Sequence, residues 1–234
     1  PTDSFHTGDS WDSVKAEVMA AVARGCDCVE VTGGEPMAAP WITDLVRLCV
    51  ELNLPPRIIT SLICPDKTLD DVLDAGVDDF LVSMHGAKDE THDAILHVPR
   101  ARHFQRRRLA KIAARMDYCV NYSMLAANQA EMADFAWWLL NCGHRPPKVA
   151  NFICFNVFGD WLRSPEWIDK GKENILDPAI AGPILDEAID ILEEAGIGVN
   201  VRYTPYCMLA ERHWKNICND LHVALDFGEW DNAI

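Results

Sequence analysis

Residues that could hold a charged ligand stand together in the run VEVTGGEPMAAP (residues 29–40). Gly33 and Gly34 allow backbone conformations that other residues rarely adopt, and their lack of side chains lets a ligand approach the backbone closely. Glu35 offers a carboxylate to a positively charged group, and Pro36 fixes the direction in which the chain leaves the turn. The pattern predicts either a tight turn alone or a site for a cationic group.

Small or polar residues also end the later strands that the sequence predicts. Ser83 and His85 alternate along one strand, so we expect their side chains to face the same way. Polar groups in an otherwise apolar sheet need hydrogen-bond partners, which a ligand with hydroxyl groups, such as a ribose, would supply. The candidates at these ends are Thr60, Ser61, Ser83, Met84, His85, Gly86, Asn121, Ser123, Asn151, Asn156, Arg202 and Tyr203.

The elements that must position these residues alternate between helical and strand-like apolar periods. Helices are predicted over residues 10–25, 39–54, 68–76, 100–116, 128–143 and 177–196. Strands are predicted over residues 27–32, 56–63, 78–86, 118–125, 148–158 and 197–206. Strands that alternate with helices indicate an α/β fold with a parallel sheet, here a partial (βα)6-type barrel. No linker divides residues 1–234, so we expect a single domain. Because the sequence starts with a helix, we also expect that the first strand of the barrel is missing from it.

The composition limits the classes of protein to which the chain can belong. The formal charge of −15 in 234 residues disfavours nucleic acids and anionic membranes as partners, because both are polyanions. Apolar residues make up 49% of the chain, enough for a sizeable core, and no apolar run approaches the roughly 20 residues that span a bilayer. The nine cysteines are an odd number, which argues against a secreted disulfide framework and favours the cytoplasm.

Two segments resemble the radical S-adenosylmethionine (radical SAM) superfamily. They are VEVTGGEPMAAPWITDLVRLCVELNLPPRIITSLI (residues 29–63) and AGVDDFLVSMHGAKDETHDAI (residues 75–95). In that family the GGEP motif holds the methionyl amino group of S-adenosylmethionine, and the strand that ends in VSMHG lies on the ribose side. Asn128, at the start of the helix after VNYSMLAAN, also fits the family pattern. The resemblance implies a cofactor-binding set of Gly33, Gly34, Glu35, Pro36, Ser61, Ser83, His85, Asn121 and Asn156.

The chain departs from the family in one motif, the three cysteines that bind a [4Fe–4S] cluster. In the family this motif precedes GGEP, so we expect these ligands upstream of Pro1, in a longer chain of which this is a fragment. Cys26 and Cys28 do not replace the motif, because their spacing is wrong and they lie where a strand begins. Cys207 and Cys218 follow the last strand, where some members bind an auxiliary cluster, but two cysteines are too few for a complete site.

The resemblance implies an enzyme that cleaves S-adenosylmethionine reductively to a 5′-deoxyadenosyl radical, which abstracts hydrogen from a small-molecule or peptide substrate. Two alternatives remain open. One is a non-catalytic binding scaffold that has lost the cluster, and the other is a different barrel lyase or isomerase. The latter predicts a lysine or paired carboxylates at strand ends, and the sequence places no lysine there.

The segment RARHFQRRRLAKIAAR (residues 100–115) is a basic cluster in an acidic chain. A cluster of this kind is either a solvated helix face or a docking surface for an acidic protein. The second interpretation, together with the resemblance, implies an electron donor such as flavodoxin or ferredoxin as a partner.

Overall fold

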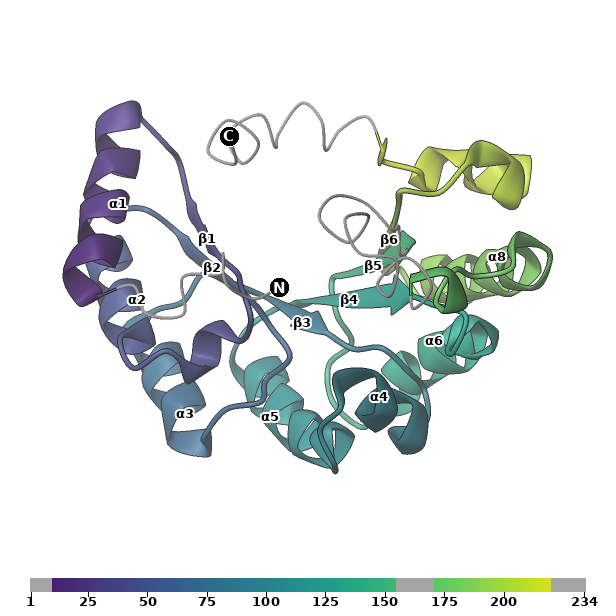
Figure 1. The fold of residues 1–234 in the computed structure, drawn as a ribbon, viewed down its shortest axis with the longest axis horizontal. Coiled ribbons are helices and arrows are strands. Elements are labelled where there is room, and N and C mark those ends of the chain that lie inside the picture. The colour runs from purple at the N-terminus through teal and green to yellow at the C-terminus, as the bar shows by residue number, and fades with distance from the viewer. Residues whose placement is uncertain (1–9, 155–170, 220–234) are drawn as a thin grey trace. The chain divides into compact units, whose positions relative to one another are not determined.

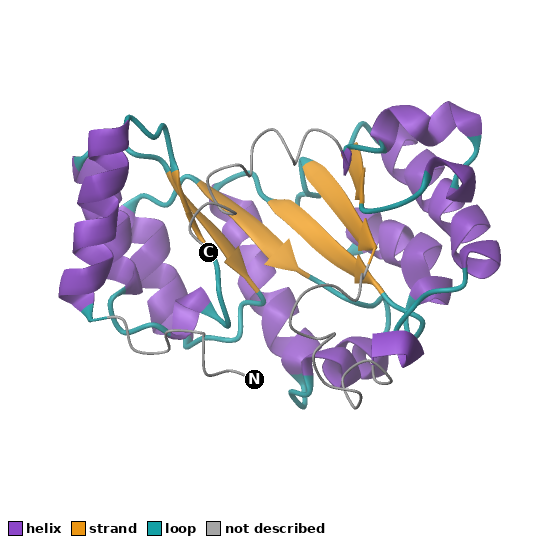
Figure 2. Ribbon diagram, turned by 45° about the horizontal axis from the view of Figure 1, so that its top comes forward, coloured by secondary structure: helices purple, strands orange, loops and turns teal. Residues whose placement is uncertain are grey.

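The computed structural model describes residues 10–154 and 171–219, which form an α/β fold (Figure 1). Helices and strands alternate along the chain (Figure 2). The helices are α1 (Trp11–Arg24), α2 (Ile42–Glu51), α3 (Asp66–Ala75), α4 (Asp89–Leu96), α5 (Ala101–Arg115), α6 (Met132–Asn141) and α8 (Pro178–Glu194). The strands are β1 (Val29–Val31), β2 (Pro56–Thr60), β3 (Asp79–Ser83), β4 (Cys119–Met124), β5 (Val149–Cys154) and β6 (Gly198–Arg202). Short 3-10 turns are η1 (Pro36–Ala38), η2 (Gln129–Glu131), η4 (Tyr206–Met208) and η5 (Glu211–Asn216).

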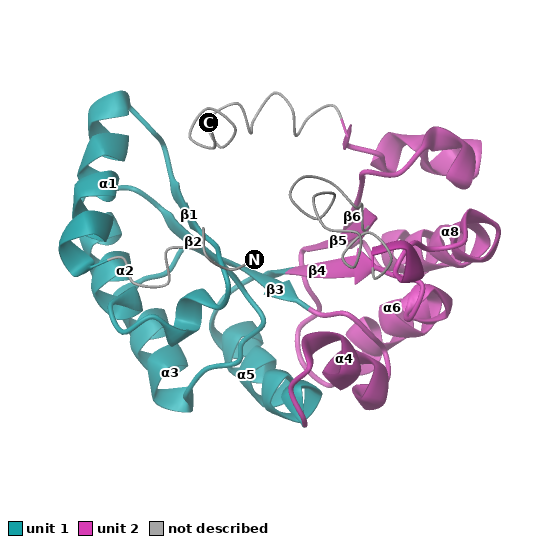
Figure 3. Cartoon of the chain, in the orientation of Figure 1, with its two compact units in different colours: residues 1–83, 100–119 teal, residues 84–99, 120–234 magenta. Residues whose placement is uncertain are grey.

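The six strands are arranged in chain order, from β1 to β6, in an open series. The strand pairs β1–β2, β2–β3 and β5–β6 are parallel, which confirms the predicted fold class of a partial α/β barrel. Contacts divide the chain into two compact units (Figure 3). Unit 1 holds residues 1–83 and 100–119, and unit 2 holds residues 84–99 and 120–234. The expectation of a single domain stays a prediction.

Unit 1 is built on three parallel strands. Val31 of β1 pairs with Ile58 of β2, and Ile58 pairs in turn with Phe80 of β3. Ile58 and Phe80 are fully buried, which is expected of β-branched and aromatic residues in a parallel sheet. The carboxyl ends of β1 and β2 therefore lie next to each other, and the residues that follow them can meet.

A ladder of ion pairs joins α3 to α5 within unit 1. Aspartates at positions 66, 70 and 74 are spaced by one helical turn, and basic residues at positions 107, 111 and 115 have the same spacing on α5. The pairs are Asp66–Arg107, Asp66–Arg108 at 2.9 Å, Asp70–Lys111 at 2.9 Å and Asp74–Arg115 at 2.8 Å. Much of the basic cluster thus has carboxylate partners in its own unit, and a docking role for the cluster stays a prediction.

Unit 2 contains β5 and β6, which pair in parallel from Val149–Gly198 to Ile153–Arg202. The Tyr122 ring of β4 lies 4.8 Å from the ring of Phe135 on α6 and 5.7 Å from that of Phe152 on β5. These three rings are fully buried and form the centre of this unit's core.

The structure differs from the predicted elements at two helix starts and adds one helix. Helix α3 begins at Asp66 after Pro65, so Thr68 lies inside the helix and does not cap it. Asn128 precedes the turn η2, and α6 starts only at Met132. Helix α4 was not predicted as a separate element. None of the described helices is long and apolar enough to cross a membrane.

Candidate functional site

The Glu35 carboxylate is the centre of a hydrogen-bonded turn in unit 1. Its Oε1 atom accepts a hydrogen bond from the backbone N–H of Met37 at 3.0 Å and one from the Thr60 hydroxyl at 2.5 Å. Its Oε2 atom accepts from the Ser61 backbone N–H at 2.9 Å and from the Ser61 hydroxyl. The first bond caps the short turn η1, and the other three tie the segment after β1 to the end of β2.

These four bonds define what Glu35 can do. An ionised carboxylate has about four acceptor positions, and two donors already reach each oxygen. A positive group that binds here would share these oxygens with Thr60 and Ser61. Glu35 therefore positions the turn and also supplies a negative charge that no positively charged side chain of this network neutralises.

The two glycines before Glu35 leave open space beside the turn. Gly33 has a φ of +136°, a conformation that L-residues rarely adopt, whereas Gly34 is not among the glycines with positive φ. A Cβ atom added to either glycine meets no atom within 4 Å. Packing within the protein therefore does not explain why residue 34 is a glycine. A ligand that occupies the space beside Gly34 would explain it.

Two buried polar residues of α5 hold the strand ends of unit 1. The Gln105 side-chain amide donates to the carbonyl of Ser61 at 3.1 Å and to that of Ser83 at 2.7 Å. The Arg108 guanidinium donates to the carbonyl of Leu62 at 2.8 Å, and Leu62 has a left-handed φ of 59°. Neither Gln105 nor Arg108 was predicted from the sequence. Their spacing of three within a helix was the available signal, because it puts them on the same face.

In unit 2, Asn128 fixes the end of β4 to the segment after β3. Its side-chain Nδ2 atom donates to the carbonyls of His85 at 2.9 Å and Ser123 at 2.8 Å. Its Oδ1 atom accepts from the Leu125 backbone N–H at 2.7 Å. Asn128 is fully buried, and burial of its amide group without hydrogen bonds would destabilise the folded state. These three bonds remove that cost.

The geometry fixes the tautomers of two buried histidines. The Nδ1 atom of His85 accepts from the Ser123 backbone N–H at 3.1 Å, and the Nδ1 atom of His92 accepts from the His85 backbone N–H at 3.0 Å. A nitrogen that accepts a hydrogen bond carries no proton, so each ring holds its proton on Nε2. Both imidazoles are therefore neutral in this arrangement.

A cavity of about 870 Å³ lies beside His85 in unit 2. Its walls come from the end of β4, from α4 and from residues 171–174. The lining residues are His85, Glu90, Thr91, Ala94, Ile95, Leu96, His97, Ser123, Leu125, Ala127, Gly171, Glu173 and Asn174. The size and the largely apolar lining with a few polar groups are typical of a small-molecule site.

Glu131 fixes the start of α4, one wall of this cavity. Its Oε2 atom accepts from the backbone N–H groups of Ala87 at 3.0 Å and Lys88 at 3.2 Å. Its Oε1 atom accepts from the Thr91 hydroxyl at 2.6 Å. A buried carboxylate at a helix N-terminus is favoured by the helix dipole, and here it orients the helix against the cavity.

The structure brings some of the predicted cofactor residues together. Glu35 contacts Ser61 directly, and the buried Pro36 opens η1 beside them. Gly33, Gly34 and Ser83 also lie in unit 1, where Gln105 binds the carbonyl of Ser83. His85 and Asn121 lie in unit 2, and Asn156 lies outside the described residues.

The cysteines of the described residues are free thiols. Burial raises the pKa of Cys49 and of Cys64 to about 11, and it also raises the pKa of Cys154, so these thiols stay protonated at neutral pH. Cys207 is exposed and Cys218 is half-buried. Within residues 10–154 and 171–219, no group of three or more His, Cys, Asp or Glu side chains could hold a metal ion. The described residues therefore do not offer the ligands of a [4Fe–4S] cluster.

A protein-family model matches more than half of the chain. Residues 5–128, which are 124 of the 234 residues, match the model of the radical SAM superfamily. No curated protein sequence matches the chain.

Solved structures share the fold at low sequence identity. A domain of pyruvate-formate lyase-activating enzyme from Bacteroides vulgatus is similar with a TM-score of 0.57 and 18% identity, over 74% of this chain and 98% of that domain. Streptococcus suis SuiB bound to S-adenosylmethionine is similar with a TM-score of 0.61 and 12% identity. That match covers 80% of this chain but only 41% of SuiB.

Proposed function

Because the chain belongs to the radical SAM superfamily, we propose that it binds S-adenosylmethionine and serves its reductive cleavage, with hydrogen abstraction from a substrate. When bound, S-adenosylmethionine and a reduced [4Fe–4S] cluster supply the chemistry: one electron breaks the bond between sulfur and C5′, methionine leaves, and the 5′-deoxyadenosyl radical takes a hydrogen atom from substrate. The described residues do not hold the cluster, so their part in this function is the binding of S-adenosylmethionine.

The single observation that carries this proposal is the turn at Glu35. A carboxylate held by three residues faces a turn whose two glycines leave space that no protein atom fills. A methionyl group presents an ammonium, and its attraction to a carboxylate in a partly buried site is stronger than in water. Thr60 and Ser61 orient the carboxylate, and the glycines give access to it.

In unit 2, considered by itself, we propose that the cavity beside His85 can bind a nucleoside. Its apolar walls, including Leu96 and Leu125, suit a flat aromatic ring, and Ser123 offers a hydroxyl to a ribose. His85 lines the same cavity as a neutral ring. Glu131 holds the start of α4 and so keeps this wall in place.

The test compares two variants in the full-length, cluster-loaded protein. The Cβ atom of Gly34→Val would meet no protein atom within 4 Å, so we expect only a small change in thermal stability and a loss of S-adenosylmethionine binding of at least about 10-fold in calorimetry. Ala114→Val, at an exposed position of α5, is the matched control and should leave the affinity unchanged, with at most a small loss of stability from the lower helix propensity of valine. Unchanged affinity in Gly34→Val would mean that the GGEP segment is only a turn.

The reaction also needs an electron donor, and we propose a flavodoxin or a ferredoxin. Both are acidic proteins, so their docking would use basic residues of this acidic chain. A measurement of 5′-deoxyadenosine formation with each reduced donor would test this. No formation with any donor, despite a loaded cluster and bound S-adenosylmethionine, would favour a non-catalytic scaffold.

A further inference from the structure

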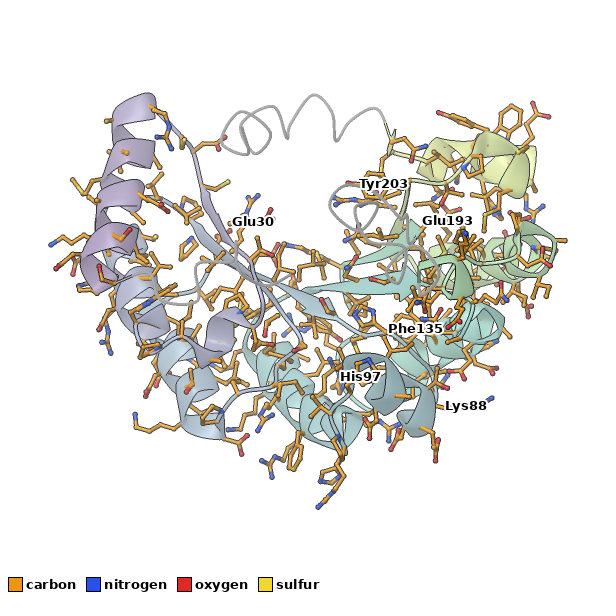
Figure 4. All side chains as sticks on the ribbon, in the orientation of Figure 1. Glu30, Lys88, His97, Phe135, Glu193 and Tyr203 are labelled. Carbon is orange, nitrogen blue, oxygen red and sulfur yellow. The ribbon has the colours of Figure 1, made fainter. Side chains whose placement is uncertain are left out.

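The strands of unit 2 have two faces of different character. Tyr122 of β4 contacts Phe135 of α6 and Phe152 of β5. Tyr122 and Phe152 therefore point to the face of the strands that the helices cover. Phe135 on α6 is labelled in Figure 4. Side chains alternate along a strand, so Asn121 and Asn151, each one residue away, point to the opposite face.

The same face continues onto β6. The Asn200 side-chain amide donates to the Oδ1 atom of Asn151 at 2.9 Å, which places both on one face. Arg202 lies two residues beyond Asn200 and therefore shares it. The polar face of unit 2 is thus formed by Asn121, Ser123, Asn151, Asn200 and Arg202. Strands of parallel α/β sheets are usually apolar on both faces. Three amides and a guanidinium on one face are therefore unusual and indicate a polar ligand.

Two groups on the polar face lack the partners that buried polar atoms normally have. Among the described residues, the Oδ1 atom of Asn121 and the Nε atom of Arg202 are buried and make no hydrogen bond. Nor does Arg202 form an ion pair with any carboxylate of the described part of the chain. Acidic residues outnumber basic ones by 36 to 21, so an arginine left without a carboxylate is unexpected on composition alone.

We infer that the polar face binds a small carboxylic acid that carries an N–H or O–H group beside its carboxylate. The inference rests on the proposed function and names the substrate class. The guanidinium of Arg202 can bind a carboxylate through two parallel hydrogen bonds, which satisfies its buried Nε. The Oδ1 atom of Asn121 accepts a hydrogen bond, so it needs a donor from the ligand.

The spacing of the strands suits one ligand of moderate size. In the strand order, β5 separates β4 from β6, so the backbones of Asn121 and Arg202 lie two strand spacings, or at least about 10 Å, apart. The bonded pair of Asn151 and Asn200 lies two residues before the Ile153–Arg202 pair along β5 and β6 and offers further amide groups on the same face. The long side chain of Arg202 can cover part of this distance, whereas that of Asn121 is short, so the ligand itself must span the rest.

The experiment uses the full-length, cluster-loaded protein and two probes that differ only in their terminal group, a carboxylate in one and a neutral amide in the other. N-acetylglycine carries an N–H group beside a carboxylate, and N-acetylglycinamide is its neutral counterpart. We expect N-acetylglycine to bind in ligand-detected NMR and to bind about 10- to 100-fold more weakly to Arg202→Gln, with a smaller loss in Arg202→Lys. Arg24→Gln, at an exposed arginine that ends α1, is the control and should bind like the wild type.

Four outcomes would overturn the inference or separate it from the proposed function. Equal binding of the two probes would contradict the proposed carboxylate site. Unchanged binding of N-acetylglycine to Arg202→Gln would contradict it as well. A loss of S-adenosylmethionine affinity in Arg202→Gln with unchanged probe binding would assign the arginine to the methionyl carboxylate instead. If the wild type bound the probe through Arg202 but did not bind S-adenosylmethionine, the proposed function would fail while the carboxylate site stood.

Discussion

Ser61 donates two hydrogen bonds to one carboxylate oxygen of Glu35, one from its backbone N–H at 2.9 Å and one from its hydroxyl. A residue at the end of β2 therefore determines the conformation of the turn that follows β1. The Glu35 carboxylate accepts all four hydrogen bonds. A side chain at position 35 must therefore have a hydrogen-bond acceptor at both of its terminal atoms.

Glu35→Gln should therefore destabilise the protein as well as weaken cofactor binding. Its amide nitrogen would face a donor, either Ser61 or the pair of Thr60 and Met37, and at least one bond would be lost. We expect a loss of about 1–3 kcal/mol in the free energy of unfolding, measured by chemical denaturation. Ser61→Ala removes only the hydroxyl donor and should cost less. Equal stability of Glu35→Gln and the wild type would show that the network contributes nothing to the fold.

Gly182→Ala should destabilise the protein although alanine favours helices. In an exposed helix this change would stabilise by up to about 1 kcal/mol. At Gly182 of α8, however, a Cβ would clash with the backbone carbonyl oxygen of Met208, which cannot move away as a flexible side chain could. We expect a net loss of about 1–3 kcal/mol by thermal denaturation. Gly34→Ala, where the added Cβ meets nothing, should leave the melting temperature unchanged.

Asn128→Ala should be among the most destabilising single changes in unit 2. It removes three side-chain bonds and leaves buried backbone groups of His85, Ser123 and Leu125 without that partner. We expect a loss of roughly 2–4 kcal/mol. Asn141→Ala is the matched control, because that exposed side chain makes one bond to a carbonyl of its own helix. Similar losses in both variants would contradict a special role for Asn128.

The ion-pair ladder predicts how stability depends on pH. Hydrogen bonds from Arg107 and then Arg108 lower the pKa of Asp66, and a bond from Arg212 lowers that of Asp190. A carboxyl group whose pKa is lowered by folding stabilises the folded state above its ordinary pKa near 4, and this stabilisation is lost as the pH falls through the lower, folded-state pKa. Asp66→Asn should therefore be less stable than the wild type at pH 7, and the difference should shrink toward pH 3 in denaturation series. A constant difference would mean that Asp66 acts through packing alone.

The sequence predicted the fold because the alternation of two apolar periods is a local property that each segment carries by itself. It predicted that Glu35 and Ser61 would lie close, since both follow parallel strands whose ends share one edge. It did not predict that Gln105 and Arg108 hold these ends, because residues in a basic helix are indistinguishable from solvated ones until the helix is packed. Asn128 was predicted to start a helix, whereas it precedes the turn η2. Its partner His85 lies 43 residues away, and no local pattern reveals such a contact.

The alternation of Asn121 and Tyr122 on β4 also has a consequence for how this chain can change over evolutionary time. Substitutions at either position alter one face only. Insertion or loss of a single residue within β4 would instead exchange the two faces, placing amides against Phe135 and the tyrosine ring on the polar side. We therefore expect insertions and deletions among related chains to fall in the segments between the strands. The number of residues from Asn121 to Ser123 on β4 and from Asn200 to Arg202 on β6 should stay constant.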